Sequence, residues 1–335
     1  MTNDVLRLAA ELMAIDSTSG QEGELMAHVS LMLESRGWRV TRIPVTPGRM
    51  NVHATCVHEP LVTLSTHLDT VPPYIPPRIV EDTLWGRGAC DAKGIAAAMI
   101  LAAERLRERD CPVALLFVVG EELSHDGAHA ANERPGSSRV LIDGEPTELK
   151  LGLGTKGALR AVIRTTGVAA HSAYPELGDS AITKLIALLH EIPTLELPHD
   201  ELLGATTINI GQLTGGVADN VIAPEAEARI MVRLVSDAEE VWALLTKWIA
   251  GRATLERGSL VPAMRLNSAP GFETTVVAFA TDVPELTRWG KPYLYGPGSI
   301  HVAHTAQEHI SRAELLAAVD GYVRLAEAAL AIDRR

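Results

Sequence analysis

The chain has 335 residues, of which 47% are hydrophobic and 21% charged, so it holds enough apolar material for a large core and is long enough for two domains. Its net charge of −12, with no run of more than two Lys or Arg residues, argues against nucleic acid or an anionic membrane as partner and favours a small soluble ligand. The three cysteines form no CxxC pair and no segment approaches the ~20 apolar residues of a membrane span, so we expect a cytoplasmic protein.

The first half of the chain alternates helix-like and strand-like segments. The expected helices are 4–15, 22–36, 95–109 and 125–133, and the expected strands are 38–43, 51–57, 61–65, 113–119 and 139–142. Such alternation predicts a mixed α/β fold, in which a mostly parallel sheet has helices on both faces.

The second half begins with a different order of elements. Strands are expected at 158–166, 206–213, 226–235 and 260–266, and helices at 180–192 and 237–250. This β-α-β-β-α-β order is the ferredoxin-like split pattern, and it predicts an inserted α+β domain over 157–266. The remaining parts, 1–156 and 267–335, would form one discontinuous domain, with further helices at about 273–281 and 311–331.

The stretch GRGACDAKG, from Gly86 to Gly94, places Asp91 between a glycine-rich turn and the start of a helix. Taken alone, Asp91 could simply cap that helix. Other polar residues at strand ends favour a metal site instead.

Five side chains with nitrogen or oxygen donors form the candidate ligand set. They are His67, Asp91, Glu122, Glu145 and His304. The first four lie at the ends of predicted strands or at a helix start, and the carboxyl ends of parallel strands converge on one crevice. Two imidazoles and three carboxylates suit a pair of divalent metal ions, each with one histidine, one terminal carboxylate and a shared bridge, for which we favour Asp91.

Two acids beside this set extend the interpretation. Asp69, two residues after His67, can accept the second imidazole N–H of that histidine. Glu121 stands directly before Glu122, where like charges repel unless a cation offsets them, so Glu121 is the candidate general base for a metal-bound water. Alone, the pair could be the acidic first turn of a helix, and His304 could be a surface histidine.

Seven segments carry a family resemblance. They are THLDTVP, GRGACDAKG, GEE, GEPT, GVAAHSAYPELGDSAI, GGVADNVIAPEAEARIMVR and GPGSIHVAHTAQE. In this order they resemble the signatures of the metallopeptidase and deacylase family that contains acetylornithine deacetylase, succinyl-diaminopimelate desuccinylase and the zinc glutamate carboxypeptidases.

The resemblance implies roles at the metal centre. The five candidate ligands would hold zinc, with cobalt or manganese as possible substitutes, and Glu121 would be the base. Asp143 could compete with Glu145, but the deacetylase and desuccinylase branch has its ligand at the glutamate of GEP.

The resemblance also implies roles for the inserted domain. The domain corresponds to the family's lid, which usually mediates homodimerisation. His171 would reach the partner's active site and stabilise the developing oxyanion, although it could also be a plain turn residue. Asn220 and Arg233 match positions that hold the substrate carboxylate, although Arg233 could instead pair with a neighbouring acid.

We therefore expect a dinuclear zinc amidohydrolase that removes the acyl group from an N-acyl amino acid, in the manner of acetylornithine deacetylase. A dipeptidase or aminoacyl carboxypeptidase would share every metal ligand. A non-catalytic metal-binding or assembly protein would have lost the base or a ligand, whereas all six positions are present here. Cys90 is expected only to pack, and His301 to be exposed or to lie behind the ligands.

Overall fold

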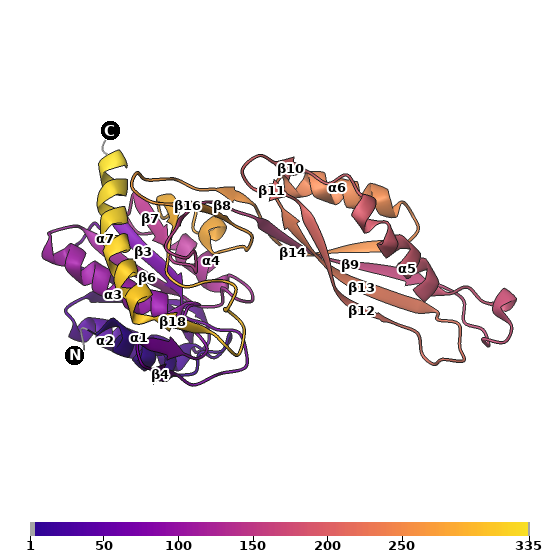
Figure 1. The fold of residues 1–335 in the computed structure, drawn as a ribbon, viewed down its shortest axis with the longest axis horizontal. Coiled ribbons are helices and arrows are strands. Elements are labelled where there is room, and N and C mark those ends of the chain that lie inside the picture. Colours follow the sequence, from indigo (N-terminus) through magenta and orange to yellow (C-terminus); the bar gives the residue numbers. More distant parts are fainter. Residues whose placement is uncertain (1–3, 334–335) are drawn as a thin grey trace. The chain divides into compact units, whose positions relative to one another are not determined.

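The computed structural model describes residues 4–333, and the chain divides into two compact units (Figure 1). Unit 1 comprises the chain up to Leu153, Leu266–Thr275 and the chain from Thr281 onward, and unit 2 comprises Gly154–Arg265 and Val276–Ala280. Each unit has its own hydrophobic core.

Unit 1 is built on a sheet with a parallel centre. The strands β6 (Val113–Val118), β3 (Val62–His67), β7 (Val140–Asp143) and β17 (Lys291–Leu294) are parallel neighbours in that order. Antiparallel strands flank them, namely β2 (Arg49–Thr55) and β1 (Arg39–Thr46) beside β6, and β8 (Leu151–Thr155) beside β17. β8 also pairs with β15 (Met264–Arg265) and β16 (Thr274–Val277).

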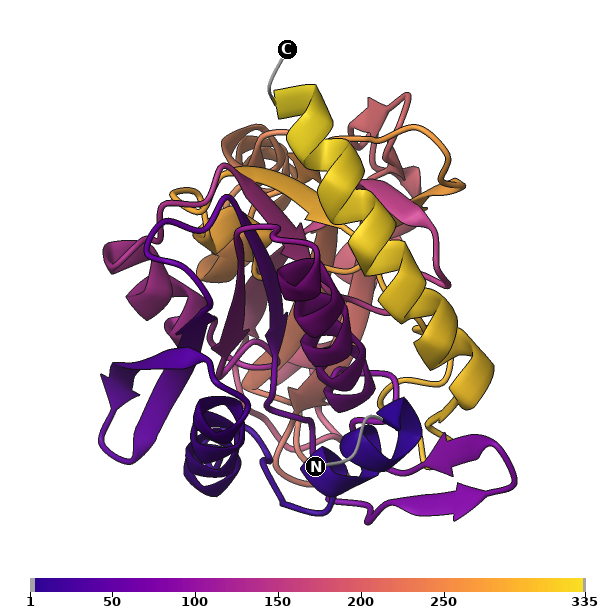
Figure 2. The same cartoon turned by 90° about the vertical axis from the view of Figure 1, so that its left-hand side faces the viewer.

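Helices cover both faces of this sheet, as the alternation of elements predicts. One face packs against α1 (Val5–Met13), α2 (Gly23–Ser35), α3 (Lys93–Glu108) and α7 (Arg312–Asp333). Figure 2 shows α7, in yellow, lying beside α3, with which it is in contact. The other face packs against α4 (Asp126–Glu133) and Trp289, next to the short 3-10 helix Val283–Glu285. Alternate residues of β6 enter the two cores, which explains its continuous apolar sequence.

A small second sheet of unit 1 joins two distant segments. It consists of β4 (Arg78–Val80), β5 (Thr83–Trp85) and β18 (His309–Ser311). Because β18 pairs with β5, the segment that carries His304 lies close to the glycine-rich stretch that carries Asp91.

Unit 2 has the ferredoxin-like order. Its main elements are β9 (Gly157–Thr166), α5 (Ala181–His190), β12 (Thr207–Gly215), β13 (Glu225–Leu234), α6 (Ala238–Ile249) and β14 (Thr254–Val261). The sheet order is β12-β13-β9-β14, with every neighbouring pair antiparallel. Both helices lie along one face of this sheet (Figure 1), and the other face is open. The pair β10 (His199–Asp200) and β11 (Gly204–Ala205) and two 3-10 turns, Pro175–Leu177 and Ile192–Thr194, complete the unit.

Two expectations about single elements are wrong. The segment 273–281 contains strand β16 and no helix, because the β-branched run Thr274–Val277 favours an extended backbone. The strand expected over 260–266 is misplaced: the fourth strand of unit 2 is β14, Thr254–Val261, and it ends before Pro262, which lacks the N–H that a continuing ladder needs. Met264 and Arg265 form a separate strand that pairs with β8. Within residues 4–333, none of the helices has the length and hydrophobicity that crossing a bilayer requires.

Candidate metal centre

Three neighbouring strands bring most of the candidate ligands to one edge of the unit 1 sheet. His67 is the last residue of β3, Glu121 and Glu122 follow β6, and Glu145 follows β7. β3 lies between β6 and β7 and is parallel to both, so the three strand ends lie side by side.

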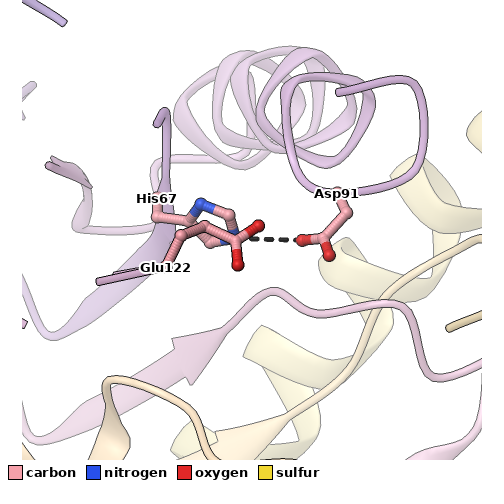
Figure 3. Close-up of side chains that lie close together, drawn as sticks. All are labelled: His67, Asp91 and Glu122. Atoms are coloured by element: carbon pink, nitrogen blue, oxygen red, sulfur yellow. Dashed lines mark hydrogen bonds and ion pairs between the residues drawn. The ribbon is translucent and has the colours of Figure 1, made fainter. Parts of the chain in front are cut away.

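The donor atoms of His67, Asp91 and Glu122 lie within 4.8 Å of one another (Figure 3). The Nε2 atom of His67 is 3.0 Å from Oδ1 of Asp91. The Nε2 atom of His304 is 3.2 Å from Oδ2 of the same carboxylate and 2.9 Å from Oε1 of Glu122. Asp91 therefore presents one oxygen to each imidazole, which is the arrangement that a carboxylate bridging two cations needs.

Asp91 does not cap the helix that follows it. α3 begins at Lys93 with Ala92 before it, and the structure from residue 4 to 333 contains no side-chain cap for this helix. The carboxylate is instead shared between the two histidines, which removes the plain alternative for this residue.

A buried glutamate, Glu308, fixes the backbone of the Asp91 loop. Its Oε1 atom accepts hydrogen bonds from the backbone N–H groups of Gly88 at 2.9 Å, Cys90 at 3.3 Å and Asp91 at 3.3 Å. Its Oε2 atom accepts from Nη1 of Arg87 at 2.6 Å. We did not assign Glu308 a role from the sequence, although it ends the segment HTAQE that begins at His304.

Asp69 holds the turn that carries the two adjacent glutamates. Its carboxylate accepts hydrogen bonds from Oγ of Ser19 at 2.8 Å and from the backbone N–H groups of Glu121 at 3.1 Å and Glu122 at 3.2 Å. Nδ1 of His67 is 3.0 Å from the backbone oxygen of Asp69 and 3.5 Å from its Oδ1 atom. The carbonyl is thus the nearer partner of the imidazole, while the carboxylate mainly orders the turn.

Burial and crowding of acids dominate the electrostatics. Burial raises the pKa of Glu121 well above its usual range, and Asp282 and Glu122 nearby add to the shift. Burial also raises the pKa of Glu145, and the charge of Glu121 raises it further. Although burial opposes it, hydrogen bonds from His304 and His67 keep the pKa of Asp91 low.

The donor set fits divalent metal ions. The hydrogen bond to Asp91, followed by that to Glu122, raises the pKa of His304 to about 10, because the imidazole faces two carboxylates. Buried carboxylates at this density repel one another, and divalent cations held by mixed nitrogen and oxygen ligands would relieve that repulsion.

Glu145 and Asp143 are both buried, with 5% and 2% exposure. Glu145 does not belong to the group of three donors drawn in Figure 3. The negative charges of Glu121 and Asp91 contribute to its raised pKa. Oδ2 of Asp143 has no hydrogen-bond partner among residues 4–333. The charges of both acids interact with that of His67, and the family resemblance remains the reason for preferring Glu145.

The other candidates lie in unit 2. His171 is exposed, and its Nδ1 atom accepts a hydrogen bond from the N–H of Ala173 at 3.1 Å. The backbone oxygen of Asn220 accepts from the N–H of Ser172 at 2.9 Å, so the loops that carry His171 and Asn220 are joined. Arg233 is half-buried on β13. Cys90 and His301 belong to unit 1. Cys90 is buried in the core of that unit, and His301 is exposed.

Comparison with known proteins decides the family. Residues 153–254 match the model of the peptidase dimerisation domain of the M20 family. A probable carboxypeptidase of Aspergillus fumigatus is 37% identical over 381 residues, which cover 97% of this chain and 87% of the relative. The chain belongs to the M20 metallopeptidase family. It is therefore a hydrolase of a metal-dependent family, as the signature segments imply.

Solved M20 structures share the fold. A tripeptidase from Staphylococcus aureus aligns over 97% of this M20 chain and 98% of its own, with a TM-score of 0.80 and 20% identity. A dinuclear metal-binding M20 peptidase from Bacillus subtilis aligns over 98% of both chains, with a TM-score of 0.72 and 16% identity. At these identities the likeness establishes the architecture, and the substrate has to be argued from the residues of this chain.

Proposed function

We propose that this M20 protein is a dinuclear zinc amidohydrolase that removes the acyl group from an N-acyl amino acid. The observation that carries the proposal is the position of Asp91, with one carboxylate oxygen toward His67 and the other toward His304. Glu121, which the ligand set leaves free, is half-buried, and its charge interacts with those of His67 and Glu122.

We assign the proposed ligands to two sets. His304 touches Asp91 and Glu122, so these three would hold one ion. His67, which touches Asp91, would hold the other ion together with Asp91 and Glu145, and Glu145 is included because of the family resemblance and its charge interaction with His67. When bound, the ions supply Lewis-acid polarisation of the amide carbonyl and an acidified water. Zinc suits the mixed ligands, and cobalt or manganese could substitute.

Glu121 is the proposed general base and acid. Its carboxylate takes a proton from the attacking water and passes that proton to the leaving amine. Burial raises the pKa of Glu121, so the carboxyl group is a stronger base than an exposed glutamate and can also return the proton.

The partner subunit's His171 is the proposed donor to the tetrahedral oxyanion. Nδ1 of His171 accepts the Ala173 N–H, so the ring proton of the neutral imidazole is placed on Nε2. An Nε2–H group is the donor that this role requires. The substrate α-carboxylate is the proposed ligand of Asn220, on the adjoining loop, and of Arg233, whose planar fork suits a carboxylate.

The surface of unit 2 supports the proposed homodimer. Strand β12 is an edge strand with nearly every residue exposed, and such an edge can pair with another chain. An apolar groove runs between β12 and α5, where Leu213 is 53% exposed and Ile186 54%. A second copy of the chain would cover both features.

The second candidate is a carboxypeptidase or dipeptidase, and it is favoured by the names of the relatives. Both activities cleave an amide next to an amino acid with a free α-carboxylate, and they differ in whether the acyl side bears a free amine. We propose a cytoplasmic location for either enzyme, consistent with the unpaired cysteines.

A substrate panel tests the proposal. Zinc-loaded and cobalt-loaded protein would be assayed with N-acetyl amino acids, dipeptides and tripeptides, with Glu121→Gln as the control for contaminating hydrolases. We expect turnover of N-acetyl amino acids above that of peptides. Turnover of peptides alone would replace the deacylase with the peptidase, and turnover of neither class would refute both.

A further inference from the structure

Four arginines lie on the open face of the unit 2 sheet, opposite α5 and α6. They are Arg160 and Arg164 on β9 and Arg229 and Arg233 on β13. In both strands these residues alternate with buried ones that pack against the helices, which places all four on the same side.

Two of these arginines are neutralised by glutamates. Arg164 bonds to Glu227 at 2.7 Å and also pairs with Glu256, and Arg229 bonds to Glu227 at 2.9 Å. Their charges are therefore matched within the sheet itself.

The guanidinium groups of the other two arginines, Arg160 and Arg233, make no hydrogen bond or ion pair within residues 4–333. Arg160 stands directly opposite Met231, so Arg233 is its diagonal neighbour across the antiparallel pair, at about 7 Å between their Cα atoms. Thr207 stands opposite Arg233 on the other side, in β12, and completes a polar strip across three strands.

An unmatched pair of cations is a notable feature in a chain of net charge −12. Burial lowers the pKa of Arg233, and the nearby positive charge of Arg160 lowers it further, because like charges at this spacing repel. A bound anion would remove this repulsion, as the glutamates do for Arg164 and Arg229.

We propose that Arg160 forms a second anion subsite beside Arg233, which binds the side-chain carboxylate of an acidic amino acid in the substrate. The inference rests on the proposed function, in which Arg233 holds the α-carboxylate. The two carboxylates of aspartate or glutamate are joined by a short carbon chain, so neighbouring guanidinium groups can each hold one of them. A cationic side chain such as that of ornithine would meet the positive charge of Arg160 and be disfavoured.

The test compares N-acetyl-L-glutamate with N-acetyl-L-glutamine, which has nearly the same shape but lacks the side-chain charge. We expect the zinc-loaded wild-type enzyme to prefer the glutamate compound by about tenfold or more in kcat/KM. Arg160→Ala should abolish this preference through the KM of the glutamate substrate, with the glutamine substrate unchanged, and Arg160→Lys should keep part of it. Arg229→Ala, which removes an equal but matched charge from the same face, should keep the preference.

The inference is overturned if the wild-type enzyme does not prefer the acidic substrate, or if Arg160→Ala weakens both substrates equally. Calorimetric binding of free L-glutamate and L-glutamine to the zinc-loaded protein separates this failure from failure of the proposed function. If neither acetyl compound is cleaved, tighter binding of glutamate that is lost in Arg160→Ala still supports the subsite. Equal binding of the two amino acids contradicts it.

Discussion

The loop that carries Asp91 and the loop that carries His171 hold their functional side chains in opposite ways. Asp91 is 5% exposed, both of its carboxylate oxygens have partners, and Glu308 binds the backbone N–H groups of its loop. His171 is exposed, and among residues 4–333 its ring has one hydrogen bond, which Nδ1 accepts from the backbone N–H of Ala173. The side chain of Asp91 is thus fixed by several contacts, whereas that of His171 is oriented by one hydrogen bond and remains exposed to solvent.

This contrast follows from what each residue is expected to bind. Metal ligands must be held in position before the ion arrives, because each ligand has to match a defined coordination geometry. A residue that acts on a partner's substrate completes its surroundings only when the subunits meet. The burial of Asp91 and the exposure of His171 are therefore consistent with the proposed roles, in which Asp91 binds metal within unit 1 and His171 acts on the substrate of a second chain.

Removing Asp91, the proposed bridge, should produce the largest effect. Asp91→Ala deletes a carboxylate that reaches both His67 and His304, so we expect loss of both bound ions and activity at the background level. Metal analysis of the purified variant, together with turnover, measures this. Asp320→Ala, which removes an exposed acid from α7, should leave both quantities unchanged. A variant at Asp91 that keeps two ions would show that the bridge is elsewhere.

Removing the exposed histidine should cost less. We expect His171→Ala to lower kcat by about 10²- to 10³-fold, the usual loss for one oxyanion donor, with metal content and unfolding temperature unchanged. Mixing this variant with Glu121→Gln tests whether the histidine acts across subunits. Heterodimers would contain one site with both groups intact, so activity should partly return. If the mixture stays inactive while heterodimers form, His171 does not serve the partner's site.

Loosening the Asp91 loop should have a smaller effect. Glu308→Gln keeps the size of the side chain but removes the charge that faces Arg87 and three backbone N–H groups. We expect zinc affinity to fall by about 10- to 100-fold, as for other groups that orient metal ligands. Competition with a chelator measures it, with the exposed Glu327→Gln on α7 as the control. An unchanged affinity would mean that the loop is held without Glu308.

The dependence of zinc binding on pH should be the mildest effect. The hydrogen bond to Asp91 and then that to Glu122 raise the pKa of His304 to about 10, so the metal-free imidazole carries a proton at neutral pH that the ion must displace. Zinc affinity should therefore rise with pH, by about tenfold per pH unit for each proton released. Calorimetry in buffers of different ionisation enthalpy counts these protons. Affinity that is constant with pH would show that the ligands are already deprotonated.

Sequence reasoning could predict those features that depend on local pattern. The continuous apolar runs of β3 and β6, each followed by polar residues, indicate parallel strands whose ends meet, and the structure places His67 beside Glu122. The order of the first five elements of unit 2 likewise follows from periodicity, whereas the last strand lies at Thr254–Val261, earlier than the expected 260–266. A short segment such as Thr274–Val277 gives too little pattern to separate strand from helix.

Contacts between distant residues could not be predicted in this way. Glu308 binds the N–H of Gly88 across 220 positions of sequence, and no spacing rule links the two. The division of labour at Asp69, where the carbonyl meets His67 and the carboxylate meets the Glu121–Glu122 turn, depends on backbone geometry that only coordinates provide. Whether Arg160 has a carboxylate partner likewise depends on which positions of the neighbouring strands carry a glutamate.

The most direct test of the account is to count bound zinc and measure turnover in the wild-type protein and in Glu121→Gln. The account predicts two ions per chain in both proteins, with kcat reduced in the variant by about 10²- to 10⁴-fold, because a base is lost and no ligand is touched. A variant that keeps full turnover, or one that loses an ion together with its activity, would contradict the separation of the base from the ligands.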